Sequence, residues 1–130
     1  MKCVLALVLG IALLVAVPLS AHHGDAIYDT SAKNVTLKGT VTEWVWANPH
    51  CVLRFDVTDN GQTAHWVAET TAPPSLIQRG WTKQSLKPGD QVTITVLPVK
   101  NGRTVGRLIE VLFPDGQKLP RGGPEQNGGQ

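Results

Sequence analysis

The stretch PPSLIQRG, from Pro73 to Gly80, decides how this chain folds. It predicts a short helix over about Ser75–Arg79, because proline is accepted in the first turn of a helix and glycine commonly ends one. The segments on both sides of this helix have the patterns of β-strands. The number of strands before and after it therefore sets the topology.

Three strand-like segments precede the predicted helix. The first covers residues 35–45, where apolar and polar residues alternate with the period of two that is typical of a half-buried strand. Gly39 within it predicts a bulge or a tight bend. The run ends at Asn48-Pro49, because proline lacks the amide hydrogen that a strand ladder needs.

The second and third segments are joined by a turn. From His50 to Thr58 the apolar residues fall on one face, and they are Cys51, Leu53, Phe55 and Val57. Asp59-Asn60-Gly61 then predicts a hairpin, since Asn and Gly tolerate the positive φ angles of such turns. The third strand is expected at about Thr63–Thr70.

Two strands follow the helix. One is expected at Gln91–Leu97 and the last at Thr104–Phe113, separated by a turn at Asn101-Gly102. The whole order predicts an all-β fold with one short helix, an OB-fold-like five-stranded barrel with the connectivity β-β-β-α-β-β. A small open β-sandwich is the alternative. Closure into a barrel would cover the strand edges that a short sheet leaves exposed.

The two ends of the chain differ from this β-rich middle. Residues 1–21 have the parts of a cleaved signal peptide, with Lys2 before an apolar run and small residues at its exit. The run is shorter than the roughly 20 apolar residues of a spanning helix, although an uncleaved anchor is the alternative. We expect a signal peptide at 1–21, an N-terminal arm at 22–33, the OB-like barrel at 34–119 and a disordered tail at 120–130.

Charge and cysteine content narrow the classes of function. The net charge is +2, and cleavage after Ala21 removes Lys2 and brings it closer to zero. With no basic block, nucleic acid is not an expected partner, and no second hydrophobic run would span a membrane after signal removal. Only Cys51 survives cleavage, so no internal disulfide is expected even in an oxidising compartment. The sequence therefore predicts a periplasmic domain that is held together by its core.

Several short motifs occur in order along almost the whole predicted mature chain. They are HHG at 22–24, YD at 28–29, VTLKGTV at 35–41, WANPH at 46–50, WVAE at 66–69, RGW at 79–81, SLKPGD at 85–90 and FPDG at 113–116. In these motifs the chain resembles a family of small exported bacterial proteins that is defined only as a domain of unknown function. WANPH and the paired histidines are the most specific of them. The resemblance implies an exported, barrel-like domain and brings no activity with it.

The paired histidines at the predicted mature start are the first candidate site. Cleavage before His22 gives this residue a free α-amine beside its imidazole, and His23 adds a second imidazole. Such nitrogen donors suit copper(II) or nickel(II), and an amine pKa of about 7.7–8.0 allows binding near neutral pH. His50, which follows the Asn-Pro turn, is the expected third ligand. We therefore predict a copper site at His22, His23 and His50; the alternative is a polar spacer at the start and a turn-capping role for His50.

The second candidate is an aromatic face. Counting along the first strand places Trp44 and Trp46 on one face, opposite Val41 and Val45. OB-folds bind extended ligands on one face, often by aromatic stacking. Two exposed tryptophans, with Glu69 as the acid of this region, would form a platform for a protein, a peptide or a glycan. The alternative is that a bulge returns Trp46 to the core.

No catalytic pattern accompanies these candidates. The chain has neither a G-x-S-x-G elbow nor a P-loop, and Glu69 alone makes no acid–base pair. Cys51 falls in the apolar register of its strand and is expected to be buried. His65 is expected on a solvent-exposed strand face. We therefore expect a small binding protein and not an enzyme, whose partner is a metal ion, a periplasmic protein or a small ligand.

Overall fold

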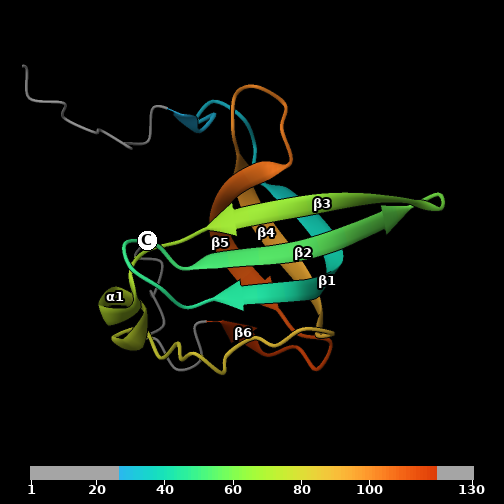
Figure 1. The fold of residues 1–130 in the computed structure, drawn as a ribbon. Coiled ribbons are helices and arrows are strands. Elements are labelled where there is room, and N and C mark those ends of the chain that lie inside the picture. Colours follow the sequence, from blue (N-terminus) through green and yellow to red (C-terminus); the bar gives the residue numbers. More distant parts are fainter. Residues whose placement is uncertain (1–26, 120–130) are drawn as a thin grey trace, which may run out of the picture.

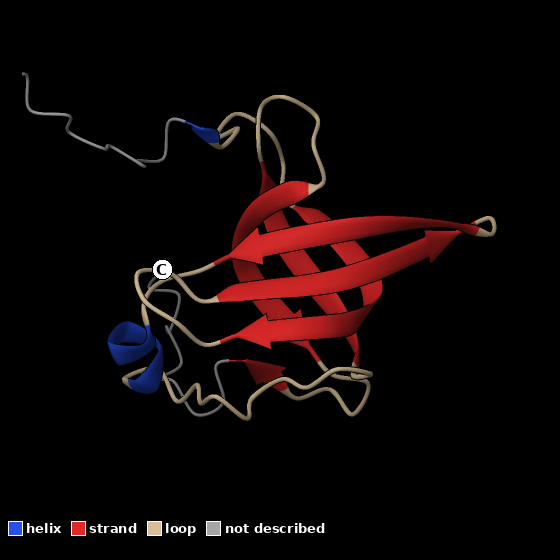
Figure 2. Ribbon diagram, in the orientation of Figure 1, coloured by secondary structure: helices blue, strands red, loops and turns tan. Residues whose placement is uncertain are grey.

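The structure is a computed structural model that describes residues 27–119 (Figure 1). The predicted signal peptide, the predicted tail, and His22 and His23 of the arm lie outside the described residues. The described part contains six strands and one short α-helix, coloured by type in Figure 2. Their bounds are β1 Val35–Val45, β2 Val52–Asp59, β3 Gln62–Glu69, α1 Pro73–Ile77, β4 Gln91–Pro98, β5 Val105–Leu112 and β6 Lys118–Leu119.

Five strands close into a barrel, with α1 between β3 and β4 at one end of it (Figure 1). The order around the barrel is β3-β2-β1-β4-β5, and β3 pairs with β5 to complete the ring. The β3–β5 pairing is parallel, whereas the neighbouring pairs are antiparallel. The prediction of an all-β, OB-like barrel is confirmed, and the open sandwich is excluded.

The short parallel pairing of β3 with β5 closes the barrel, and we call it the closure seam. Its paired residues are Val67 with Val105, Ala68 with Gly106, and Glu69 with Arg107. Gly106 also pairs with Pro98 of β4, so two strands approach it from opposite sides. A Cβ atom at this position would lie 2.8 Å from the carbonyl oxygen of Leu97 and 2.9 Å from Cβ of Val96. Only glycine fits where β5 passes between its two neighbours.

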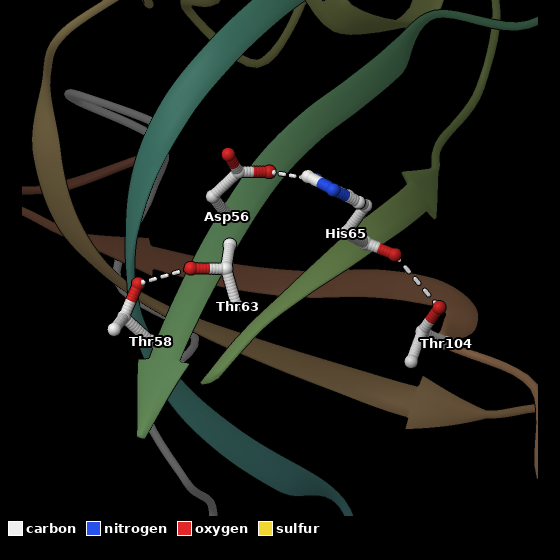
Figure 3. A network of polar contacts seen from close by, with 5 residues as sticks. All are labelled: Asp56, Thr58, Thr63, His65 and Thr104. Carbon is white, nitrogen blue, oxygen red and sulfur yellow. Dashed lines mark hydrogen bonds and ion pairs between the residues drawn. The ribbon is translucent and has the colours of Figure 1, made fainter. Parts of the chain in front are cut away.

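Two further hydrogen bonds lengthen the closure seam beyond β5. The backbone amide of Val67 donates to the carbonyl oxygen of Thr104 at 3.0 Å. The hydroxyl of Thr104 donates in return to the carbonyl oxygen of His65 at 2.7 Å, as Figure 3 shows. The loop before β5 is thus joined to β3 as well, and the barrel is closed over more than three residue pairs.

The core lies inside the barrel and is filled by apolar side chains from each of its strands and from α1. The largest of the fully buried side chains are Phe55, Leu53, Leu76, Ile94, Val41, Val96 and Val111. The predicted inward face of β2 is confirmed at Cys51, Leu53 and Phe55, each with 0 % of its surface exposed. Burial raises the pKa of the Cys51 thiol, as expected for a small hydrophobic residue in the core.

The hairpin between β2 and β3 is confirmed, but the bulge in β1 is not where it was predicted. Asn60 and Gly61 have φ angles of 49° and 76°, the positive values that a two-residue hairpin turn needs. The register of β1 against β2 shifts between Val41 and Glu43, and not at Gly39. Gly39 instead permits close packing, since a Cβ there would lie 2.8 Å from the carbonyl oxygen of Asp56.

The helix differs from the prediction at both ends, and one strand was missed. The helix spans Pro73–Ile77 and not Ser75–Arg79, because its two prolines occupy the first helical positions, where the missing amide hydrogens cost nothing. The strand β6 was not predicted, since it has only two residues and therefore no alternating pattern. Its Leu119 is nonetheless 2 % exposed and pairs with Val111, so β6 covers part of the core.

A buried and an exposed isoleucine can be compared to test whether the barrel core determines the stability of the protein. Ile94 is 0 % exposed, and Ile94→Ala should lower the free energy of unfolding by about 2–5 kcal/mol, because it leaves a cavity in the barrel. Ile77 is 61 % exposed, and Ile77→Ala should change it by less than about 0.5 kcal/mol. Urea unfolding followed by tryptophan fluorescence measures both. Equal effects of the two substitutions would contradict this assignment of the core.

Candidate functional site

His50 lies on the loop between β1 and β2, and one of its ring nitrogens is hydrogen-bonded to the backbone. Nδ1 lies 3.0 Å from the carbonyl oxygen of Thr70. A carbonyl oxygen only accepts, so Nδ1 carries the hydrogen in this contact. In the neutral ring, Nε2 is then the unprotonated nitrogen. His50 is exposed, and it can offer this lone pair to a ligand.

The backbone beside His50 is fixed to the chain that follows β3. The Cys51 amide donates to the carbonyl oxygen of Thr71, and the Thr70 amide donates to the carbonyl oxygen of Cys51, both at 3.0 Å. The side chain of Cys51 is buried inside the barrel and fixes the chain at the same position. Local packing therefore places His50 at the end of β3, where the closure seam begins.

His50 borders a cleft of about 560 Å³, which we call the seam cleft. Its walls come from the arm, from the loops after β1 and β3, from the turn after α1 and from β5. The lining residues are Ile27, Tyr28, Pro49, His50, Glu69, Thr70, Thr71, Arg79, Arg107 and Leu108. The β1–β2 loop that carries Pro49 and His50 is one of the two loops with which OB-folds bind ligands.

Tyr28 of the arm lies across the closure seam. Its hydroxyl donates to Oε2 of Glu69 at 3.1 Å, and the guanidinium carbon of Arg107 lies 4.6 Å from the centre of its ring. Glu69 and Arg107 are paired across the seam, so Tyr28 contacts both strands at the point of closure. Only 6 % of Tyr28 is exposed. Tyr28, which was predicted to belong to the N-terminal arm, therefore forms part of the wall of the seam cleft.

The backbone of the arm is also hydrogen-bonded to the barrel. Tyr28 forms an isolated antiparallel bridge with Val99, in which the Asp29 amide donates to the carbonyl oxygen of Pro98 at 2.8 Å. The Lys100 amide donates to the carbonyl oxygen of Ile27 at 3.1 Å. These bonds hold the arm at residues 27–29 against the end of β4. Ile27, the first described residue, therefore lies at the seam cleft.

The arm turns immediately after Tyr28, and Asp29 holds this turn. Its Oδ1 accepts hydrogen bonds from the Ser31 hydroxyl at 2.6 Å and from the amides of Ser31 and Ala32 at 3.1 Å each. These contacts, above all the one from the Ser31 hydroxyl, lower the pKa of the Asp29 carboxyl group. Such a turn is a common way for aspartate to satisfy nearby backbone groups.

The tryptophans do not lie as the simple alternation predicted. The bulge after Val41 pairs Trp44 with Leu53, so Trp44 falls on the inward side with Val41 and not opposite it. Trp44 and Trp46 are both half-buried against the core, and their ring centres are 5.9 Å apart. Trp44 also contacts the buried ring of Trp81, with 5.5 Å between the ring centres.

The structure separates the predicted ligand-binding residues into two groups. Glu69 lines the seam cleft together with His50, whereas neither Trp44 nor Trp46 lines it. Trp44 has its indole nitrogen hydrogen-bonded to the carbonyl oxygen of Thr82 at 3.2 Å. The aromatic pair is thus tied into the chain that follows α1 and is not a bare platform.

His65 lies on the exposed outer face of β3, as predicted. Its Nδ1 is 2.6 Å from Oδ1 of Asp56 on β2, and Figure 3 shows the pair beside the Thr58–Thr63 contact. Among residues 27–119, no three His, Cys, Asp or Glu side chains are grouped as a metal site would need. Any site that contains His50 therefore needs ligands from elsewhere, and His22 and His23 lie outside the described residues.

Tyr28, Arg79 and Arg107 of the seam cleft were not predicted as site residues. Ile27 and Tyr28 are large apolar residues within the predicted arm, and this contrast was the available signal. Arg79 was assigned to the helix, and Arg107 had no distinguishing pattern in its strand. Their convergence depends on barrel closure, which no local pattern records.

Comparison with known protein families gives a match. The family described as "Family of unknown function (DUF6152)" matches residues 11–108, which is more than half of the chain, and the chain belongs to this family. The predicted membership of a family of unknown function is therefore confirmed. No curated protein and no solved structure matches the chain. Within residues 27–119, no helix has the length and apolar character needed to cross a membrane.

Tyr28 is the single tyrosine of the chain, so its titration reports directly on the arm. Burial, and then the charge and hydrogen bond of Glu69, raise its pKa from 10.0 to about 12. The folded state favours the protonated phenol, so this contribution to stability is complete below pH 10 and is lost as the pH rises towards 12. Tyrosinate absorbance should therefore titrate at higher pH in the folded protein than in urea.

The contribution of Glu69 can be separated in the same experiment. Glu69→Gln should lower the titration midpoint of Tyr28, because the negative charge beside the phenol is removed. Glu110→Gln is the matched control, since Glu110 pairs with Lys118 at 3.0 Å and has no contact with Tyr28 among the described residues. A midpoint in the native protein equal to that in urea would show that the arm is not bound at the closure seam.

Proposed function

We propose that this member of the family is an exported, periplasmic binding protein without catalytic activity, and that it binds copper through His22, His23 and His50. One observation carries the proposal. Ile27 and Tyr28, the first described residues of the arm, line the same cleft as His50. The paired histidines are therefore attached to the one part of the barrel surface where the third predicted ligand lies.

The length of the arm is compatible with this arrangement. His23 precedes Ile27 by four residues. Four residues of extended chain span at most about 14 Å, and fewer when the chain turns. Ile27 and His50 line the same cleft, so a connection of this length is compatible with contact between the paired histidines and His50.

The hydrogen bond of His50 also suits a metal ligand. Metal-ligating histidines usually donate their second ring N–H to a carbonyl or carboxylate oxygen, which fixes the ring orientation and makes the other nitrogen a better donor. The Thr70 carbonyl oxygen supplies such a partner at Nδ1. His50 would then ligate copper through Nε2, which has no hydrogen-bond partner among the described residues.

The proposed site further requires export and cleavage. Removal of residues 1–21 would give His22 a free α-amine, and amine and imidazole nitrogens together suit copper(II). The alternative function, a docking platform at Trp44 and Trp46, has less support. Both side chains are half-buried, and they pack against the core and each other.

The first test compares two histidines that differ in position. His50→Ala should weaken copper(II) binding to the processed protein by at least about tenfold, because one ligand is lost. His65→Ala is the matched control, since His65 is exposed and lies on the outer face of β3 beside Asp56. Calorimetric titration gives the affinities, and electron paramagnetic resonance counts the nitrogen ligands. Equal affinity of wild type and His50→Ala would remove His50 from the site.

The second test concerns the α-amine. One residue added before His22, with the new N-terminus verified by intact mass, should weaken copper binding and change the ligand-field spectrum, because the amine moves away from the imidazole. An added residue after Gly24 would be the control, since it leaves the first two residues unchanged. If the added residue before His22 alters neither affinity nor spectrum, the amine is not a ligand.

A further inference from the structure

We propose that the seam cleft contains a binding site for the carboxylate group of a small molecule, formed by Arg79 and Arg107. Both arginines line the cleft, although they come from different elements. A volume of about 560 Å³ falls within the range of about 300–1,000 Å³ that is usual for small-molecule sites. This site would use residues that the copper proposal does not, and it does not depend on copper.

Arg79 is held in place by the turn that follows α1. Its backbone amide donates to the carbonyl oxygen of Leu76 at 2.9 Å, and the next residue in the turn, Gly80, has a positive φ of 83°. Leu76 itself is 1 % exposed. The side chain of Arg79 is exposed and has no charged or hydrogen-bonded partner among the described residues. A fixed backbone thus presents an uncompensated guanidinium at the cleft.

Arg107 reaches the cleft from the closure seam. The carbon of its guanidinium lies 4.6 Å from the centre of the Tyr28 ring, and this contact holds the group at the seam. The group has five N–H donors in a rigid fork, so it can bind more than one acceptor at once.

The charge balance of the cleft favours a singly charged anion. The charged side chains in its lining are Arg79, Arg107 and Glu69. Glu69 offsets one of the two arginines and already accepts the hydrogen bond from Tyr28. Arg79, which has no charged partner among the described residues, contributes a single positive charge, and this matches a carboxylate better than a doubly charged phosphate. Thr70 and Thr71 also line the cleft and bring hydroxyl groups that can donate to a bound oxygen.

The planar arrangement of the N–H donors in a guanidinium group also favours a carboxylate over a phosphate. Guanidinium and carboxylate groups form two parallel hydrogen bonds in one plane, and these charge-assisted bonds are stronger than bonds between neutral groups. Glu69 is an acceptor in the same cleft. It favours a carboxylate ligand that also carries a donor, such as the hydroxyl group of a hydroxy acid.

The experiment uses the protein as recovered from the expressing cell, with bound metal removed by a chelator that is then dialysed away. Lactate, acetate and inorganic phosphate are titrated in turn, with binding followed by calorimetry and by amide NMR shifts. We expect saturable binding of lactate that is tighter than that of acetate or phosphate. The shifts should be largest at Thr70, Thr71 and Arg79. Non-saturable binding of all three anions would overturn the proposal.

Three arginine variants identify the site. Arg79→Ala should weaken lactate binding about tenfold or more, because a charge-assisted hydrogen bond is lost. Arg107→Lys should also weaken it, since lysine keeps the charge but lacks the planar fork. Arg103→Ala is the control for net charge, because Arg103 is exposed and does not line the cleft. Equal weakening by Arg79→Ala and Arg103→Ala would show attraction by overall charge only and would refute the site.

The same variants separate this proposal from the copper proposal. Arg79→Ala should leave copper affinity within about twofold of wild type, because Arg79 supplies no nitrogen ligand. Wild-type protein that does not bind copper would refute the copper site and would leave the lactate result unaffected. Wild-type protein that binds copper but does not bind lactate would refute the carboxylate site alone.

Discussion

The parallel pairing of β3 with β5 is the interaction on which the rest of this structure depends, because it turns a sheet with two edges into a closed barrel. Parallel strands must be far apart in sequence, and the chain between them holds α1 and β4. At Gly106 of this pairing, β5 also lies so close to β4 that no side chain fits. The closed barrel, its buried core and the seam cleft all depend on this short pairing of β3 with β5.

The seam cleft is a direct product of that closure. Glu69 and Arg107 become neighbours only when their strands pair, and Tyr28 binds to both of them. His50 joins the group because the chain beside it is hydrogen-bonded to residues 70 and 71, immediately after β3. Residues from four distant parts of the sequence thus meet outside the barrel wall, while the inward residues of the same strands, such as Ala68, remain buried.

Local patterns predicted most of the elements but not the contacts between them. Alternation identified the inward face of β2, Asn60-Gly61 identified the hairpin, and the paired prolines identified α1. Alternation failed at Trp44, because a bulge adds one residue and transfers every later side chain to the other face. It gave no signal for β6, which is too short to alternate.

The candidate site was predictable only in part for the same reason. His50 and Glu69 were noted for their chemistry, whereas Tyr28, Arg79 and Arg107 matter through position. Each of these three residues is unremarkable within its own segment, and only closure brings them to one cleft. A single sequence records which groups could act, but the pairing of strands that are distant in sequence decides which of them meet.

The attachment of the arm at Tyr28 has a consequence for competition between ligands. In the copper site that we propose, the histidines are joined covalently to Ile27 at the edge of the seam cleft, and a connection of this length corresponds to an effective concentration in roughly the millimolar range. Under that proposal, a molecule from solution that uses the same contacts would have to exceed this concentration or bind more tightly.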